Sequence, residues 1–319
     1  MRIFAIKHAL RMTVALLLCA SAAAQPTWPD RSIQLIVPFP AGGGVDVIAR
    51  PFAELWSAII QQPVVVVPRD GAAGTIGIAA VAEAKPDGYT LAFTPNGPIT
   101  VQPHVISTLP YKHDDLVPLC QVFAVQYVLA VRSDSPYKTL GDFVAAARSQ
   151  PRKLTYGFGG VATAPHLAIS QLTIVANIDL LGVPFRGDPP AIVALRAGEI
   201  DSAMLNIGGA KAQGFRPLAT FAETRQIEIP DTPTVKELGY PVVSSAFGGL
   251  FAPKGLPVDI AKKIESACEK IGADERFQRA VRQAAQEPVY RSSADFAKVL
   301  DADYAVKGDI VRNAGVKTQ

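Results

Sequence analysis

Residues 33–46 read Ile33-Gln34-Leu35-Ile36-Val37-Pro38-Phe39-Pro40-Ala41-Gly42-Gly43-Gly44-Val45-Asp46 and predict a strand, a glycine-rich turn and the start of a helix. The apolar run at the start is typical of a strand buried on both faces of a parallel sheet. The glycines let backbone N–H groups converge at the first helical turn, where the helix dipole adds partial positive charge. The stretch therefore predicts a backbone anion site, and a plain tight turn is the alternative.

Two nucleotide-binding fingerprints are excluded for this turn. Val47 stands where a dinucleotide fingerprint needs a third Gly or Ala, and no Gly-Lys-Ser/Thr follows, as a P-loop would require. A second glycine-rich stretch, residues 157–163, also leads from a predicted strand into a helix, and Thr163 is expected to be its N-cap. Two such helix starts facing each other across a cleft could hold one anionic group between them.

Strands and helices alternate along the whole chain, which predicts an α/β fold. The mature length, about 295 residues, favours two lobes over one core. We expect each lobe to be a mainly parallel sheet flanked by helices, with the ligand cleft between them. The first lobe is predicted at 25–125 plus 243–319 and the second at 126–242. Extended segments at 116–131 and 242–252 cross between them, and Pro95-Asn96-Gly97-Pro98 is predicted to be an open loop.

The first residues have the pattern of a secretory leader. Basic residues at positions 2, 7 and 11 precede an apolar run from Met12 to Ala20, which is too short to span a bilayer. Small residues at Ala22-Ala23-Ala24 predict cleavage before Gln25, so 1–24 is expected to be a signal peptide and the protein to be periplasmic. An uncleaved anchor and a lipid attached at Cys19 are less favoured alternatives.

Charge and cysteine content exclude several function classes. The chain has 31 Lys+Arg and 28 Asp+Glu, and the leader takes three of the basic residues, so the mature chain is formally neutral. No basic stripe remains for nucleic acid. Cys120 and Cys268 have no metal-ligand spacing, and we expect free thiols, although an oxidising compartment would permit a disulfide. Neither a metal nor a cofactor is predicted.

Catalysis is not expected either. His104, His113 and His166 belong to no nucleophile elbow, zinc-protease pattern or catalytic cysteine setting. His166 follows the second glycine-rich stretch closely, so it could contact a ligand, and a packing or capping role is equally open. The sequence predicts a binding protein and not an enzyme.

Motifs along the whole mature chain resemble the Bug-type solute receptors of tripartite tricarboxylate transporters. Beyond the first stretch, the matching segments are Pro86-Asp87-Gly88-Tyr89-Thr90-Leu91, Lys153-Leu154-Thr155-Tyr156-Gly157, Pro165-His166-Leu167-Ala168, Val183-Pro184-Phe185-Arg186-Gly187, Gly198-Glu199-Ile200-Asp201 and Asp231-Thr232-Pro233-Thr234-Val235. The resemblance implies a two-lobed periplasmic binding protein of type II. It also implies a monomer that captures a small organic carboxylate by hinge closure and passes it to a membrane permease. A receptor that serves a sensor without transport is the alternative.

The resemblance also implies a ligand site shared by both lobes. Asp46 is expected to shape its loop more than to touch an anion, because like charges repel. The expected ligand-binding residues, with His166 and Phe247 included, are Phe39, Ala41, Gly43, Gly44, Asp46, Thr94, Asn96, Gly160, Ala162, Thr163, His166, Asn206 and Phe247.

Four departures from the family pattern suggest a more apolar pocket. Val45 replaces a common Thr, Val161-Ala162 replace Asn-Gly, Leu205 stands where Asp is frequent, and Phe247-Gly248 replace a Trp-aromatic pair. Each change removes a polar group or is expected to open space. They predict a monocarboxylate with a hydrophobic or aromatic body over a citrate-like tricarboxylate.

Overall fold

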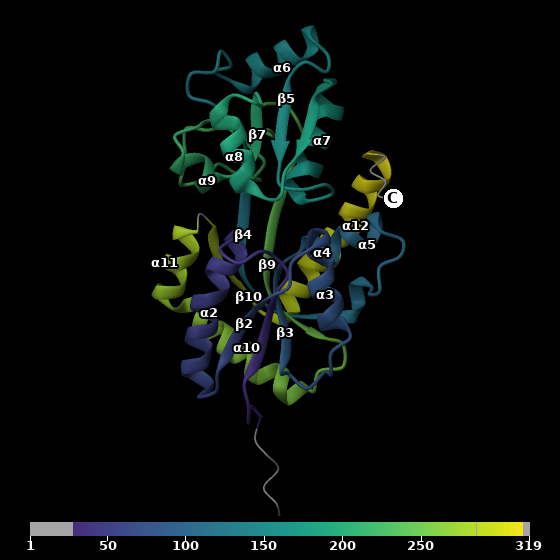
Figure 1. Cartoon of the computed structure of the whole chain (residues 1–319), viewed down its shortest axis with the longest axis vertical. Helices are drawn as coiled ribbons and strands as arrows, with labels where there is room; N and C mark the ends of the chain where they lie inside the picture. The colour runs from purple at the N-terminus through teal and green to yellow at the C-terminus, as the bar shows by residue number, and fades with distance from the viewer. Residues whose placement is uncertain (1–27, 285, 315–319) are drawn as a thin grey trace, which may run out of the picture.

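The computed structural model describes residues 28–284 and 286–314, which form two α/β lobes joined by two long strands. Figure 1 shows these strands, β4 (Leu116–Val131) and β9 (Ser245–Pro253), running between the lobes. The predicted leader, with its cleavage site and Cys19, lies outside the described residues. Within the described ranges, no helix is both long and apolar enough to cross a membrane.

The first lobe is assembled from both ends of the chain. Its N-terminal part contains β1 (Ile33–Val37), α2 (Gly44–Ile60), β2 (Val64–Pro68), α3 (Thr75–Ala82), β3 (Thr90–Pro95), α4 (Gly97–Thr100) and α5 (Gln102–Val105). After β9 returns from the second lobe, the chain adds α10 (Val258–Ala273), α11 (Glu275–Gln283), β10 (Glu287–Arg291) and α12 (Ser293–Ala314).

The second lobe is continuous in sequence. It contains α6 (Leu140–Ser149), β5 (Thr155–Phe158), α7 (Ala164–Ala176), β6 (Leu181–Pro184), α8 (Asp188–Ala197), β7 (Ser202–Asn206), α9 (Ile207–Ala212) and β8 (Arg216–Thr220). The predicted cap of α6 is present, because Thr139 Oγ1 accepts the backbone N–H of Asp142 at 3.1 Å.

Strand pairing runs without a break through both lobes. The order is β2-β1-β3-β9-β4-β7-β5-β6, and β8 and β10 also pair with β4. The outer pairs β1/β2, β1/β3, β5/β6 and β5/β7 are parallel, as predicted, whereas every pair made by β4 or β9 is antiparallel. The two-lobed α/β prediction is confirmed, and the antiparallel centre follows from two crossing strands that run in opposite directions.

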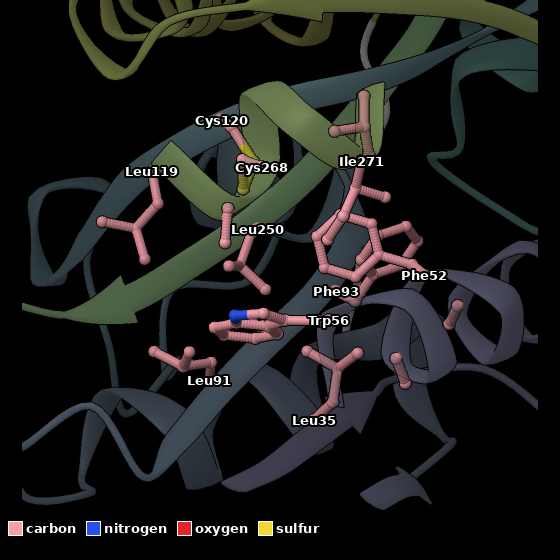
Figure 2. Close-up of a cluster of buried hydrophobic side chains, with 14 of the residues drawn as sticks. Leu35, Phe52, Trp56, Leu91, Phe93, Leu119, Cys120, Leu250, Cys268 and Ile271 are labelled. Atoms are coloured by element: carbon pink, nitrogen blue, oxygen red, sulfur yellow. A yellow bond between two sulfur atoms is a disulfide. The ribbon is translucent and has the colours of Figure 1, made fainter. Parts of the chain in front are cut away.

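Each lobe has its own hydrophobic clusters. In the first lobe, Phe52 and Trp56 of α2 pack against Phe93 of β3 and Leu250 of β9 (Figure 2). In the second, a separate cluster is built around Phe143, Phe158 and Phe221. The exact lobe boundaries near 125 and 243 stay a prediction.

The two cysteines contradict the expectation of free thiols. Cys120 of β4 and Cys268 of α10 form a disulfide in the first-lobe core, as Figure 2 shows. Their Cα atoms are 6.3 Å apart although 148 positions separate them in the sequence. That distance lies in the usual range for a disulfide. The prediction was wrong because nothing in the sequence indicates that α10 packs on β4.

The predicted open loop at 95–98 is instead a strand end followed at once by a helix. Pro95 ends β3, and the carbonyl of Asn96 accepts the N–H groups of Ile99 and Thr100, each at 2.8 Å. Pro98 occupies the first turn of α4, where its missing N–H breaks no helical hydrogen bond. The two prolines therefore frame a tight turn that faces the cleft.

Candidate functional site

A cavity of about 500 Å³ lies between the lobes. The first glycine-rich loop, 39–45, forms one side, and the second, 159–165, forms the other. Alternate residues of the crossing strand β4, Phe123, Val125 and Tyr127, form part of the wall between them. The two loops predicted to face each other do meet at one cavity.

The first loop is held by a buried carboxylate. Asp46 is 1% exposed, and its Oδ2 accepts the backbone N–H of Gly42 at 2.9 Å. Arg50 donates to both carboxylate oxygens, at 2.9 and 3.0 Å, and so balances the charge. Gly42 has φ of +77°, a conformation that favours glycine. Among the described residues no side chain caps α2, since its N-cap position is Gly43, and the N–H groups of its first turn have no side-chain acceptor there.

The second loop is held by hydrogen bonds that the sequence did not predict. Thr163 occupies the N-cap position of α7 but does not cap the helix; its hydroxyl donates to the Gly160 carbonyl at 2.7 Å. His166 Nδ1 accepts the N–H of Ala162 at 3.0 Å, and the His166 ring stacks on Phe158. Burial lowers the pKa of His166, which favours the neutral imidazole that this acceptor role requires.

The two asparagines of the wall are already hydrogen-bonded within the protein. Asn96 donates through Nδ2 to Asp303 at 2.6 Å and accepts the Phe247 N–H through Oδ1 at 3.3 Å. Asn206 caps α9 by accepting the Gly209 N–H at 2.7 Å and donates through Nδ2 to Asp188, also at 2.7 Å. Their side chains therefore brace the wall more than they offer free hydrogen-bonding groups.

The structure brings many of the predicted site residues together. Eight of them line the cavity: Phe39, Ala41, Gly43, Gly44, Asn96, Ala162, Thr163 and Asn206. The other five do not line the cavity: Asp46, Thr94, Gly160, His166 and Phe247. Phe247 packs against Phe296 because side chains alternate along β9, and its neighbour Ala246 faces the cavity instead.

Only part of the departures from the family pattern reach the cavity. Val45 and Ala162 line it, whereas Leu205 is fully buried in the second-lobe core. The prediction that Gly248 opens space was wrong. A Cβ at Gly248 would collide with the Thr94 carbonyl and with the Phe123 ring, so the glycine lets two backbones approach closely.

Sequence reasoning missed several polar residues of the wall. The missed polar residues are Gln102, Tyr127, Arg186, Asp188 and Gln286. Tyr127 could have been found from the alternation of side chains along the strand at 123–127. Arg186 belongs to the segment Val183-Pro184-Phe185-Arg186-Gly187, which resembles the family pattern, so its place near the site could also have been expected. Gln102 and Gln286 belong to distant segments, so no local pattern indicates them. Among the described residues, no cluster of three or more His, Cys, Asp or Glu side chains could hold a metal ion.

Comparison with known proteins identifies the family. A model of the tripartite tricarboxylate transporter family receptor matches residues 48–316. The chain belongs to this receptor family. The match confirms the resemblance seen in the sequence motifs and covers both lobes of the receptor.

Individual relatives agree with this assignment. A UPF0065 protein of Bordetella pertussis is 32% identical over 317 residues, covering 96% of the receptor and 97% of the relative. The solved structure of Rpa4515 of R. palustris with adipate is 26% identical, with a TM-score of 0.83, and the match covers 90% of the receptor and 98% of that chain. The structure of MatC of Rhodopseudomonas palustris with bound malate is also 26% identical, with a TM-score of 0.80, and the match covers 89% of the receptor and 100% of that chain. The receptor is therefore similar over nearly its whole length to proteins solved with carboxylates.

Proposed function

We propose that this chain is an exported binding protein that captures a small organic carboxylate between its lobes and delivers it, unchanged, to a membrane transporter. One observation carries the proposal: the N-termini of α2 and α7, neither capped by a side chain, meet at one cavity. Converging N–H groups and helix dipoles stabilise an anion without a basic side chain. The formally neutral mature chain fits a site of this kind.

The walls support a hydrophobic or aromatic body for the ligand. Phe39, Val45, Phe123, Val125 and Ile192 give the cavity a largely apolar lining. The side-chain amides of the wall asparagines are already hydrogen-bonded within the protein, so they are not available to bind a second or third carboxylate. Adipate and malate in the related structures support the carboxylate class. We expect an apolar monocarboxylate to bind more tightly here than citrate.

Closure of the two lobes supplies the signal to the transporter in this proposal. The strands β4 and β9 cross between the lobes side by side, pairing over nine residues of register, and provide a two-stranded hinge. A ligand that contacts both loops stabilises the closed form over the open one. The receptor is expected to be periplasmic, as the leader-like pattern predicts, and monomeric, as the family resemblance implies.

A thermal-shift screen of organic acids on the protein purified after export tests the proposal. A binding acid raises the melting temperature by mass action, and chromatography should recover it chemically unchanged. Calorimetry on the best acids then ranks apolar monocarboxylates against citrate. Binding of none of the acids, or conversion of a bound acid to product, would contradict the proposal. A clear preference for citrate would contradict only the apolar ligand.

A further inference from the structure

Asp188 places an unpartnered carboxylate oxygen at the cavity wall. It is the first residue of α8, and its Oδ2 accepts two hydrogen bonds from Asn206, from the backbone N–H at 3.1 Å and from Nδ2 at 2.7 Å. Within residues 28–284 and 286–314, Oδ1 has no hydrogen-bond partner. The carboxylate is thus fixed through one oxygen and free at the other.

No cation of the described chain neutralises this carboxylate. Arg186 lines the same cavity two residues earlier, but it forms no ion pair with Asp188 or with any other described residue. Burial raises the pKa of the Asp188 carboxyl, and the two hydrogen bonds from Asn206 oppose the rise only in part. The nearby Tyr127 also experiences the charge, since Asp188 adds to the burial that raises the pKa of its hydroxyl. Asp188 is half-buried and its Oδ1 stays open to the cavity, so a ligand that fills the cavity desolvates this oxygen unless the ligand itself supplies a hydrogen-bond donor.

We propose that Asp188 Oδ1 is a second ligand-binding point, and that the natural ligand carries a hydrogen-bond donor, a hydroxyl or an ammonium group, in addition to its carboxylate. The inference rests on the proposed function, in which the helix N-termini hold the carboxylate. A donor from the ligand completes the hydrogen bonding of a desolvated carboxylate, which is a strong interaction because one partner is charged. Another ligand carboxylate at this place would be repelled instead.

The geometry favours this chemistry over a dicarboxylate held by Arg186. Arg186 is exposed and has a long flexible stem, so nothing fixes its guanidinium toward the cavity. Asp188 is braced by Asn206, which is itself fixed by capping α9 through the Gly209 N–H. A preorganised acceptor loses less freedom on binding than a mobile cation does.

The test is a series of straight-chain and phenyl-bearing acids of increasing length, each in methyl-, hydroxy-, amino- and carboxy-terminated form, measured by calorimetry on the purified protein. At the matching length, the hydroxy or amino acid should bind at least about tenfold more tightly than its methyl-terminated counterpart. Comparison of the hydroxy with the amino acids decides which donor is preferred. In Asp188→Asn, which turns an amide N–H toward the cavity, this preference should be lost and the dicarboxylic acids should gain affinity.

A matched control is Asp201→Asn. Asp201 accepts the Thr155 N–H at 2.8 Å in the same lobe but does not line the cavity, so this variant should keep the donor preference. The series on the unchanged protein tests the proposal even if Asp188→Asn does not fold. Two outcomes would overturn the proposed role of Asp188 and leave the proposed function standing. One is tighter binding of the methyl or dicarboxylic forms at every length, and the other is a donor preference that survives in Asp188→Asn. Failure of all the acids to bind would overturn the proposed function as well.

Discussion

Gln102 of the first lobe donates a hydrogen bond from Nε2 to the backbone carbonyl of Ala162 in the second lobe, at 3.2 Å. Both residues line the cavity. An apolar cluster that includes Ala162 joins segments of α5, α7 and α12: Val101, Val105, Ala162, Leu167, Ile310 and Val311. The lobes therefore touch through side chains as well as through the crossing strands, and this contact has to separate when the cleft opens.

Replacement of Gln102 by Met should weaken ligand binding about three- to tenfold, because the lost hydrogen bond, worth about 1 kcal/mol, favours the closed form. Calorimetry measures the affinity, and small-angle scattering should detect a larger open fraction without ligand. The matched control is Gln278→Met, which removes a bond of the same kind, from Nε2 to the Gly272 carbonyl at 3.0 Å, together with a longer one from Arg282 at 3.4 Å; Gln278 does not line the cavity. Equal effects of the two variants on affinity would contradict a role of Gln102 in closure.

Replacement of Asp46 by Ala should lower both stability and affinity. The variant leaves the Gly42 N–H without its acceptor and Arg50 without its partner, at a cost of about 1–3 kcal/mol in the free energy of unfolding. The loop then loses the shape that directs its N–H groups. Urea unfolding and calorimetry measure the two effects. Asp142→Ala keeps the Thr139 cap of α6 but removes the carboxylate that accepts the Lys138 and Thr139 N–H groups; Asp142 does not line the cavity, so the variant should cost about 1 kcal/mol of stability while leaving affinity unchanged.

Replacement of both Cys120 and Cys268 by Ala should lower the free energy of unfolding by about 2–5 kcal/mol, because the crosslink restricts a long loop of the unfolded chain. Reduction of the unchanged protein should lower its melting temperature in the same direction. Ligand affinity should change little, since neither cysteine lines the cavity. Titration of two free thiols in the denatured, unreduced protein would show that Cys120 and Cys268 are not linked, whereas a linked pair reacts only after reduction in denaturant.

The stability of the second loop should depend on pH through His166. Burial lowers the pKa of His166 in the folded protein below its ordinary value of 6.5. At a pH between the folded-state pKa and 6.5, the unfolded chain therefore binds more protons than the folded one. The contribution of His166 is complete above about pH 6.5 and declines as the pH falls, by at most about 1.4 kcal/mol per pH unit. His166→Asn keeps an acceptor for the Ala162 N–H but cannot be protonated. Urea unfolding from pH 8 to pH 5 should show a shallower slope for this variant; identical slopes would contradict the assignment.

Long apolar segments made much of the fold predictable. The extended segment predicted at 116–131 has the limits of β4, because a mostly buried strand leaves a clear apolar pattern in the sequence. β6 and β10 were missed, since both are short and largely solvent-accessible, and their pairing partners stabilise them more than their composition does.

The candidate site was predictable where it consists of backbone. Glycine-rich helix starts identify themselves in sequence, and both loops reach the cavity. Asp188 gave no signal, because its position at the wall depends on Asn206, 18 residues further along the chain. The disulfide was equally hidden, since only packing of α10 against β4 brings the two thiols together.

The split construction of the first lobe sets an order of assembly. Strand β3 belongs to the N-terminal part of that lobe, and its neighbour β9 is synthesised only after the whole second lobe. The second lobe is an uninterrupted insertion, so its own elements are complete while β3 still lacks a partner on that side. A chain interrupted before β9 would therefore carry a finished second lobe on an unfinished first one, with an open strand edge ready to pair with other chains.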